Sequence, residues 1–502
     1  MLVLPSARES SPMRSRLLVI LLLLVVGCQA HREATPEPAA TPAVPSEAPA
    51  QPALDWLAIG GGGTPDSNEA SIEADLALGL EVFGAPKALL FAGGPDTKSV
   101  QVRDKEYPKD DLRQRLGALF APRSGRDAKY RETTLSVTAA STRDNVLATL
   151  RAETQSGGPL LVFLNGHGNM GEEPAQNLWS SWGNDVVTVA EFEDALGPRP
   201  TVWVATTCFS GGFAEMAFDE ADSSRRKAPT GPRCGVFSSP SDLESSGCDP
   251  DPDRRNHEGY AKHFFNALRG RDKEGIALPP AELDLDGDGR ISLLEAHTRV
   301  RIATESIDVP TTTSERWLRE VTRDDELEIG ALPEDTELVE DLAVAKALSA
   351  RLKLKPEQAL EGYIAVDEYL ASVQKEADEA LLIEDEAYRE VTGALLSRWP
   401  SLDDPWRADF DALLAAEGPA IETFLDESKS VQVLEEAMAE VDTLNAQADA
   451  LKIRRAPFET LVRAVETLAL AQILKARGGD DWQRYQELLE CERAFSLPKT
   501  GG

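Results

Sequence analysis

The chain has 502 residues, 42% of them hydrophobic, and a formal charge of −34 at pH 7. This length exceeds what one compact core usually holds, so we expect two or three domains. The negative charge favours solubility and repels phosphate backbones and anionic headgroups, which argues against nucleic acid as a partner.

The first thirty residues have the pattern of a bacterial secretory signal. Arginines precede the apolar run 17–26, which is shorter than the roughly 20 residues that span a bilayer. The run ends in Gly27-Cys28, which resembles a lipobox, so we expect removal of residues 1–27 and lipid attachment at Cys28. An uncleaved anchor is the alternative. Gln29 stands where an Asp would retain a lipoprotein at the inner membrane, so the prediction is a lipid anchor in the outer membrane of a Gram-negative bacterium.

Residues 28–54 are rich in Pro and Ala and have no apolar periodicity, which predicts an extended spacer between membrane and folded protein. The remaining cysteines, at positions 208, 234, 248 and 491, are in agreement with an exported protein. Cys234 and Cys248 flank a short loop and could pair in an oxidising compartment, but the sequence leaves this disulfide open.

Residues 55–325 alternate between short apolar runs and helical patterns. The expected strands are Trp56–Gly60, Ala88–Ala92, Leu160–Leu164, Thr201–Thr206 and Gly235–Ser238. The expected helices are Ser71–Phe83, Thr142–Glu153, Val189–Leu196 and Gly259–Leu268. Continuous apolar strands alternating with helices predict a three-layer α/β domain with a mainly parallel sheet. In such sheets chemistry collects at the carboxyl ends of the strands.

Residues 334–498 differ, because they are rich in Ala, Leu and Glu with apolar residues every three or four positions. This pattern predicts an all-α domain of four to six antiparallel helices. Prolines are expected at helix boundaries, at positions 356, 400, 405, 419 and 457. The domain carries no titratable cluster, which favours a packing role or docking of a protein partner.

Two of the predicted strands end in residues that suit nucleophilic catalysis. One strand leads into Asn165-Gly166-His167-Gly168 and the next into Cys208-Phe209-Ser210-Gly211. Either residue alone is ordinarily structural, but an imidazole beside a thiol makes a usable nucleophile and base. The N–H groups of Gly168 and Cys208 could form an oxyanion hole, with glycine leaving room for a substrate carbonyl.

This pair resembles the clan that unites caspases, legumains and gingipains, whose members carry His-Gly after one strand and Cys after the next. The segment from Cys234 to Cys248 is also similar to the strand and loop of bacterial legumain-like proteins. The resemblance covers roughly residues 55–325. It implies a caspase-like fold and peptide-bond hydrolysis through a thioester, with no metal or other cofactor in the chemistry.

The residues around the nucleophile depart from the clan. Thr207 stands where Ala is usual and Phe209 where legumains have an acid, which puts a legumain-like preference for Asn in doubt. The loop residues Ser239, Asp242 and Glu244 are candidate pocket residues, and the two acids would favour a basic side chain at the cleaved position.

The polar stretch 213–232 follows the nucleophile strand, where caspases carry their processed linker. We therefore hypothesise cleavage near Arg225-Arg226-Lys227, with an ordinary surface loop as the alternative.

A third motif has the spacing of a calcium loop, from position 284 to 295. Acids stand at its first, third, fifth and twelfth positions, and Arg290 would contribute its carbonyl at the seventh. The predicted ligands are Asp284, Asp286, Asp288, Arg290 and Glu295. A turn with solvated acids is the alternative. We interpret the motif as a loop that binds a structural Ca²⁺ just before a helix at Leu293–Ile302.

These patterns support three hypotheses. The first is a lipid-anchored cysteine endopeptidase acting on peptide or protein substrates through Cys208 and His167. The second is a catalytically inactive caspase-like scaffold that binds partners on the cell envelope. The third is a cysteine hydrolase that acts on non-peptide acyl groups.

Overall fold

The computed structural model describes residues 55–498 except 110, 123, 124, 155, 156, 335, 406 and 495. The predicted signal peptide, Cys28 and the spacer therefore lie outside the described residues. All described residues belong to one compact unit.

A six-stranded sheet forms the centre of this unit, with strand order β12-β10-β9-β5-β1-β2. Every pair is parallel except β10 with β12. The strands are β1 (Trp56–Gly60), β2 (Ala88–Phe91), β5 (Leu160–Asn165), β9 (Thr201–Thr206), β10 (Arg233–Phe237) and β12 (Thr311–Thr312). The α/β class with a mainly parallel sheet is confirmed.

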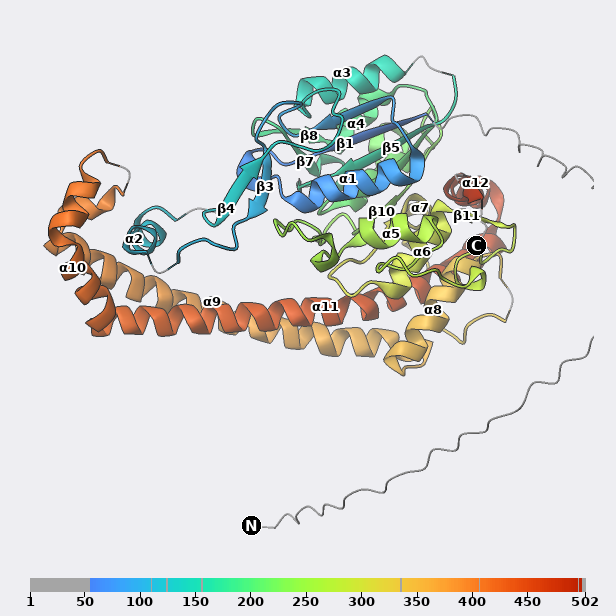
Figure 1. Ribbon diagram of the computed structural model, residues 1–502. Coiled ribbons are helices and arrows are strands. Elements are labelled where there is room, and N and C mark those ends of the chain that lie inside the picture. The colour runs from blue at the N-terminus through green and yellow to red at the C-terminus, as the bar shows by residue number, and fades with distance from the viewer. Residues whose placement is uncertain are drawn as a thin grey trace, which may run out of the picture. The chain divides into compact units, whose positions relative to one another are not determined.

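Apolar residues on both faces of the strands explain why the sheet is buried. Along β1, Trp56 and Ala58 enter one apolar cluster, whereas Leu57 and Ile59 enter the other. Helices supply the rest of each cluster, so the sheet is the middle of three layers (Figure 1). One face packs against α1 (Ala70–Phe83), α5 (Tyr260–Leu268), α6 (Leu293–Ala303) and α7 (Thr313–Val321), and the other against α3 (Arg143–Glu153) and α4 (Val189–Leu196).

Three small sheets accompany the central one. Their strands are β3 (Val100–Arg103) with β4 (Ala128–Arg131), β6 (Gly168–Asn169) with β7 (Leu178–Ser181) and β8 (Asp185–Thr188), and β11 (Arg290–Ser292) with β13 (Ser496–Pro498). Between β3 and β4 the chain forms α2 (Leu112–Phe120), which packs against the far end of the C-terminal helices.

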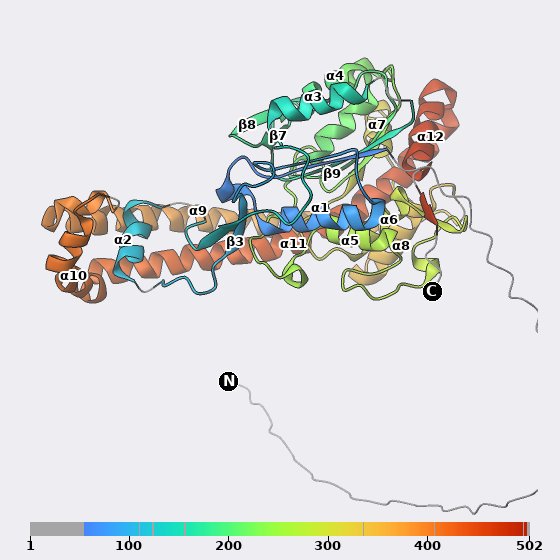
Figure 2. The same ribbon diagram turned by 45° about the horizontal axis from the view of Figure 1, so that its top comes forward.

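The C-terminal region contains five α-helices within the described residues, in agreement with the predicted range. They are α8 (Val339–Leu352), α9 (Ala359–Arg398), α10 (Phe410–Glu427), α11 (Lys429–Arg477) and α12 (Gly479–Ala494). Figures 1 and 2 show α9 and α11 side by side over most of their length. The seam between them includes Leu370, Val373, Leu444 and Leu451.

Two of the prolines expected at helix boundaries lie inside helices instead. Pro419 is within α10 and Pro457 within α11. A proline costs one backbone hydrogen bond and about 3 kcal/mol in a helix interior. Around Pro457 the α11 residues Ala456, Leu461 and Val462 are buried, so tertiary packing outweighs this local penalty.

The helices are joined to the sheet by a disulfide and by buried ion pairs. Cys234 on β10 is bonded to Cys491 on α12, so the Cys234–Cys248 pairing left open by the sequence does not form. Cys234 is a buried residue of β10 whose side chain lies in the apolar cluster that includes α12. Cys248 lies elsewhere, beyond the carboxyl ends of the strands and near His167. Glu315 on α7 also forms an ion pair with Arg463 of α11, with 2.9 Å between Oε1 and Nη2.

Candidate active site at the carboxyl ends of the strands

The sheet places His167 and Cys208 side by side. In the β5–β9 register Asn165 pairs with Thr206, so both candidate residues stand two positions beyond the last paired residues of neighbouring strands. A Cβ atom on Gly168 would lie 2.1 Å from the carbonyl oxygen of Cys208, so only glycine fits at that position. The His-Gly and Cys segments are therefore packed against each other.

The imidazole of His167 is held from both sides. Its Nε2 lies 2.9 Å from Glu69 Oε2, and its Nδ1 lies 3.7 Å from Cys248 Sγ. Glu69 is the N-cap residue of α1 and follows β1, and Cys248 follows β10. No hydrogen bond joins His167 to Cys208 among the described residues. Glu69, His167, Cys208 and Cys248 thus come from the ends of four strands that are adjacent in the sheet, β1, β5, β9 and β10.

The thiol of Cys208 contacts the loop that follows β10. Its Sγ accepts the backbone N–H of Ser245 at 3.3 Å and lies 3.4 Å from the Ser245 carbonyl oxygen. The next residue, Phe209, has a left-handed backbone with φ of 59° and donates its N–H to Leu243 O. A left-handed non-glycine residue costs about 1–2 kcal/mol, and such strain clusters at functional sites.

Buried polar residues fix this loop against the nucleophile. Asp308, which is fully buried, accepts Ser245 Oγ at 2.8 Å and the Ser246 N–H at 2.7 Å. Asn177 donates to the carbonyl oxygens of Phe209 and Ser241 at 3.0 and 2.8 Å. The position of the Ser245 backbone beside Cys208 is therefore set by hydrogen bonds from outside the loop.

Burial and neighbouring charges shift the pKa values of the two candidate catalytic residues. Burial raises the pKa of the Cys208 thiol to about 11, and the neighbouring Cys248 and Glu244 add to this effect. Burial acts to lower the pKa of His167, but Cys248 and Glu69 outweigh it and raise that pKa to about 11. The free protein at neutral pH therefore holds an imidazolium and a neutral Cys208 thiol.

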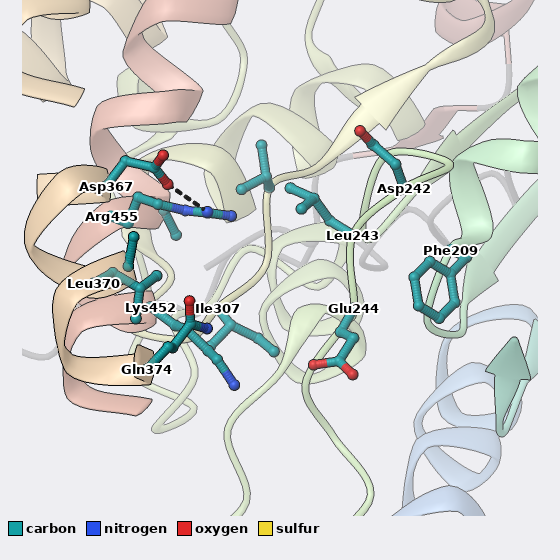
Figure 3. A pocket seen from close by; sticks show the side chains of 13 residues that line it. Phe209, Asp242, Leu243, Glu244, Ile307, Asp367, Leu370, Gln374, Lys452 and Arg455 are labelled. Carbon is teal, nitrogen blue, oxygen red and sulfur yellow. Dashed lines mark hydrogen bonds and ion pairs between the residues drawn. The ribbon is translucent and has the colours of Figure 1, made fainter. Parts of the chain in front are cut away.

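The three candidate pocket residues occupy different surroundings. Ser239 is fully buried, and its Oγ contacts Ser210 Oγ and Thr207 O, so it lies beneath the site. Asp242 and Glu244 are exposed and line a pocket of about 380 Å³ next to Phe209. Figure 3 shows that the opposite wall of this pocket comes from α9 and α11.

Of the oxyanion-hole candidates, the Cys208 N–H makes no hydrogen bond within the described part of the chain. Gly168 lies in β6, paired with Trp179 of β7. The resulting oxyanion hole stays a prediction.

The calcium motif brings three of its five predicted ligands together. Carboxylate oxygens of Asp284, Asp286 and Asp288 lie within 4.8 Å of one another. Glu295 uses its Oε2 to cap α6 through Ser292 and its Oε1 to accept the N–H of Leu285. Arg290 donates its N–H to Asp288 Oδ1, and the role of its carbonyl as a ligand stays a prediction. The donor set of clustered carboxylates fits Ca²⁺, which prefers oxygen ligands.

The segment proposed for cleavage is folded onto the protein. Its first part, 213–218, is buried, and its basic residues are exposed but ion-paired. Arg225 pairs with Glu220 and Asp222, and Lys227 pairs with Asp219. Cleavage here stays a hypothesis.

Glu69, Cys248 and Asp308 carry no sequence pattern that places them at this site. Glu69 and Asp308 are acids within polar loops, and only the strand order brings them to the site. The sequence offers Cys248 only as a disulfide candidate, because its place beside His167 depends on how the loop after β10 returns to the strand ends.

No protein-family model matches the chain, and a search of curated proteins found no match. No helix among the described residues combines the length and apolar character needed to cross a bilayer.

Proposed function

We propose that this protein is a cysteine endopeptidase with a caspase-like catalytic domain, in which Cys208 is the nucleophile and His167 the proton-transfer group. The observation that carries the proposal is the register of β5 and β9, which sets the two residues at equivalent positions beyond neighbouring strand ends. The tight contact of Gly168 with Cys208 and the strained turn at Phe209 support it.

In the proposed reaction the Cys208 thiol gives its proton to solvent, because the imidazolium of His167 already carries its own, and the sulfur attacks the scissile carbonyl carbon. The Cys208 N–H and Gly168 N–H would stabilise the oxyanion. The C–N bond breaks, His167 protonates the leaving amine, and water hydrolyses the thioester. Because His167 carries its proton in the free protein, it is already able to act as the acid and to stabilise a Cys208 thiolate.

Substrate binding must alter the free site. The thiol nearest to His167 Nδ1 is that of Cys248, and the Cys208 thiol is held by Ser245. Catalytic hydrogen bonds are often long or absent before substrate binds. The same two contacts favour the second candidate, an inactive scaffold, because a buried thiol with a raised pKa and no imidazole contact is a poor nucleophile.

Hydrolysis of a peptide library by the full-length protein tests the proposal, with Cys208→Ala and His167→Ala as the inactive variants. We expect cleavage by the wild type and a loss of at least about 10³-fold in kcat/KM in each variant. Equal cleavage by wild type and Cys208→Ala would exclude Cys208 as the nucleophile. Cleavage of acyl esters alone would favour a non-peptide hydrolase.

We also propose that Cys28 anchors the protein by a lipid to the outer membrane. Mass spectrometry of the N-terminal peptide from membrane fractions tests this, with Cys28→Ala expected to remain unlipidated.

A further inference from the structure

The pocket beside the candidate nucleophile has two walls from distant parts of the sequence. One wall belongs to the loop after β10 and contains Asp242, Leu243 and Glu244. The other belongs to α9 and α11, and includes Asp367, Ala371, Lys452 and Arg455 (Figure 3). Its volume of about 380 Å³ lies within the range of small-ligand sites, about 300–1,000 Å³.

The charges on the helix wall are already compensated. Arg455 Nη1 lies 2.8 Å from Asp367 Oδ1, and Arg455 also pairs with Glu459 at 3.5 Å. Lys452 Nζ lies 3.2 Å from Asp449 Oδ1. Each cation thus has an acidic partner on the helices themselves.

The charges on the loop wall are not compensated. Asp242 and Glu244 form no hydrogen bond or ion pair within the described residues, although both border the pocket. Glu244 is also close enough to Cys208 to raise the pKa of its thiol. The charges in the pocket that have no partner are therefore negative, and they lie on the wall nearer to Cys208.

Part of the pocket lining is apolar. Leu243 and Ile307 belong to the loops that follow β10 and α6, and Leu370 and Ala456 belong to α9 and α11. A pocket lined by both apolar residues and carboxylates suits a long side chain with an aliphatic stem and a cationic head, as in Lys and Arg.

We propose that α9 and α11 form one wall of a substrate subsite that accepts an Arg or Lys side chain of the polypeptide, with Asp242 and Glu244 receiving its charge. This inference rests on the proposed peptidase function, but binding can be tested without turnover. It gives the C-terminal helices a role in substrate selection.

The test uses full-length protein carrying Cys208→Ala and fluorescein-labelled Gly/Ala octapeptides with one Arg or one citrulline at matched positions. Citrulline keeps the shape of Arg and removes its charge. We expect the Arg peptide to bind up to about 25-fold more tightly at one position, since two exposed charge pairs contribute up to about fivefold each. The ratio of the dissociation constants of the citrulline and Arg peptides should fall to about one in the Asp242→Asn, Glu244→Gln variant.

The helix wall is tested by Ala371→Trp, which fills the pocket from α9, with Ala365→Trp as the matched control. Both alanines are exposed on α9, but Ala365 does not line the pocket. We expect Ala371→Trp to weaken binding of the Arg peptide about tenfold and the control to leave it unchanged.

Equal binding of Arg and citrulline peptides, tighter binding of a Glu peptide, or equal effects of the two tryptophans would overturn the inference. Selective binding of Arg by Cys208→Ala without cleavage by the wild type would instead overturn the proposed peptidase function and leave the subsite standing.

Discussion

Glu69 Oε2 lies 2.9 Å from Nε2 of His167, and the two residues follow neighbouring strands, β1 and β5. The carboxylate is mostly buried, with 13% of its side chain exposed. A carboxylate at one ring nitrogen fixes the orientation of an imidazole and turns the other nitrogen to the reacting groups. Glu69 is thus a positioning residue in the proposed site.

Glu69→Gln should keep a hydrogen-bond partner at Nε2 but remove the negative charge that favours the imidazolium. We expect the pKa of His167 to fall and kcat/KM to decrease about 10–10²-fold, with the alkaline limb of the pH profile moving to lower pH. NMR titration of His167 and the pH dependence of hydrolysis measure these effects. Glu81→Gln, at the other end of α1, is the control; an unchanged His167 pKa in Glu69→Gln would refute the role of Glu69.

The two free thiols near His167 should differ in their chemical roles. We expect Cys208→Ala to abolish hydrolysis and Cys248→Ser to keep at least about a tenth of the wild-type kcat/KM, because the predicted oxyanion-hole N–H groups are those of Cys208 itself and of Gly168, which packs against it. Labelling with a peptide-directed electrophile, mapped by mass spectrometry, identifies the attacking sulfur. Loss of activity and labelling only in Cys248→Ser would assign the nucleophile to Cys248.

Most strands of the central sheet could be predicted because each is a continuous apolar run. Trp56–Gly60 and Thr201–Thr206 have the predicted bounds, since residues buried on both faces leave little choice of structure. His167 and Cys208 could be placed together for the same reason, as parallel neighbours end at the same edge.

The partners of these residues depend on folding at long range. Glu69 reaches His167 across 98 positions, and Cys234 reaches Cys491 across 257. Contacts between residues so far apart in the sequence leave no local sequence pattern from which they could be predicted. The predicted helix boundary at Pro457 is wrong because the penalty for proline applies to an isolated helix, whereas α11 is stabilised by its buried face.

The disulfide between Cys234 and Cys491 should stabilise the attachment of α12 to β10. Removing a native disulfide typically costs about 2–5 kcal/mol. We therefore expect the Cys234→Ser, Cys491→Ser variant to lose about this much free energy of unfolding, measured by urea titration. Cys248→Ser is the control and should change stability little, since Cys248 is an exposed free thiol. A double variant as stable as the wild type would contradict the prediction.

Glu315 should make the attachment of the helices sensitive to acid. Burial acts to raise the pKa of Glu315, but Arg463 and Arg319 outweigh it and lower that pKa to about 2. The unfolded carboxylate takes up protons near pH 4.5, before the folded one does. The contribution of Glu315 to the free energy of unfolding is therefore fully present above about pH 4.5. It is lost as the pH falls toward 2, and the loss amounts to up to about 3 kcal/mol.

Glu315→Gln should remove this part of the pH dependence and destabilise the protein by about 3–5 kcal/mol at pH 7, because the buried Arg463 loses its partner. Urea titrations at pH 7 and pH 4 measure both effects. Glu379→Gln, on an exposed part of α9, is the control. A variant with the wild-type pH dependence would show that other groups cause the acid sensitivity.

Calcium should stabilise the loop 284–295 and its pairing with the strand β13. The loop ends in β11, which pairs with β13 near the C-terminus, so ordering of the loop would also order this pairing. We expect Ca²⁺ at 100 times its dissociation constant to add about 2.7 kcal/mol to the free energy of unfolding. Calorimetric titration should give micromolar to millimolar affinity, as in exported calcium modules. Asp286→Asn, Asp288→Asn should abolish both effects, whereas Asp272→Asn, in a separate turn, should keep them. Equal stabilisation by Mg²⁺, or Ca²⁺ binding that survives loss of both loop carboxylates, would exclude this loop as the calcium site.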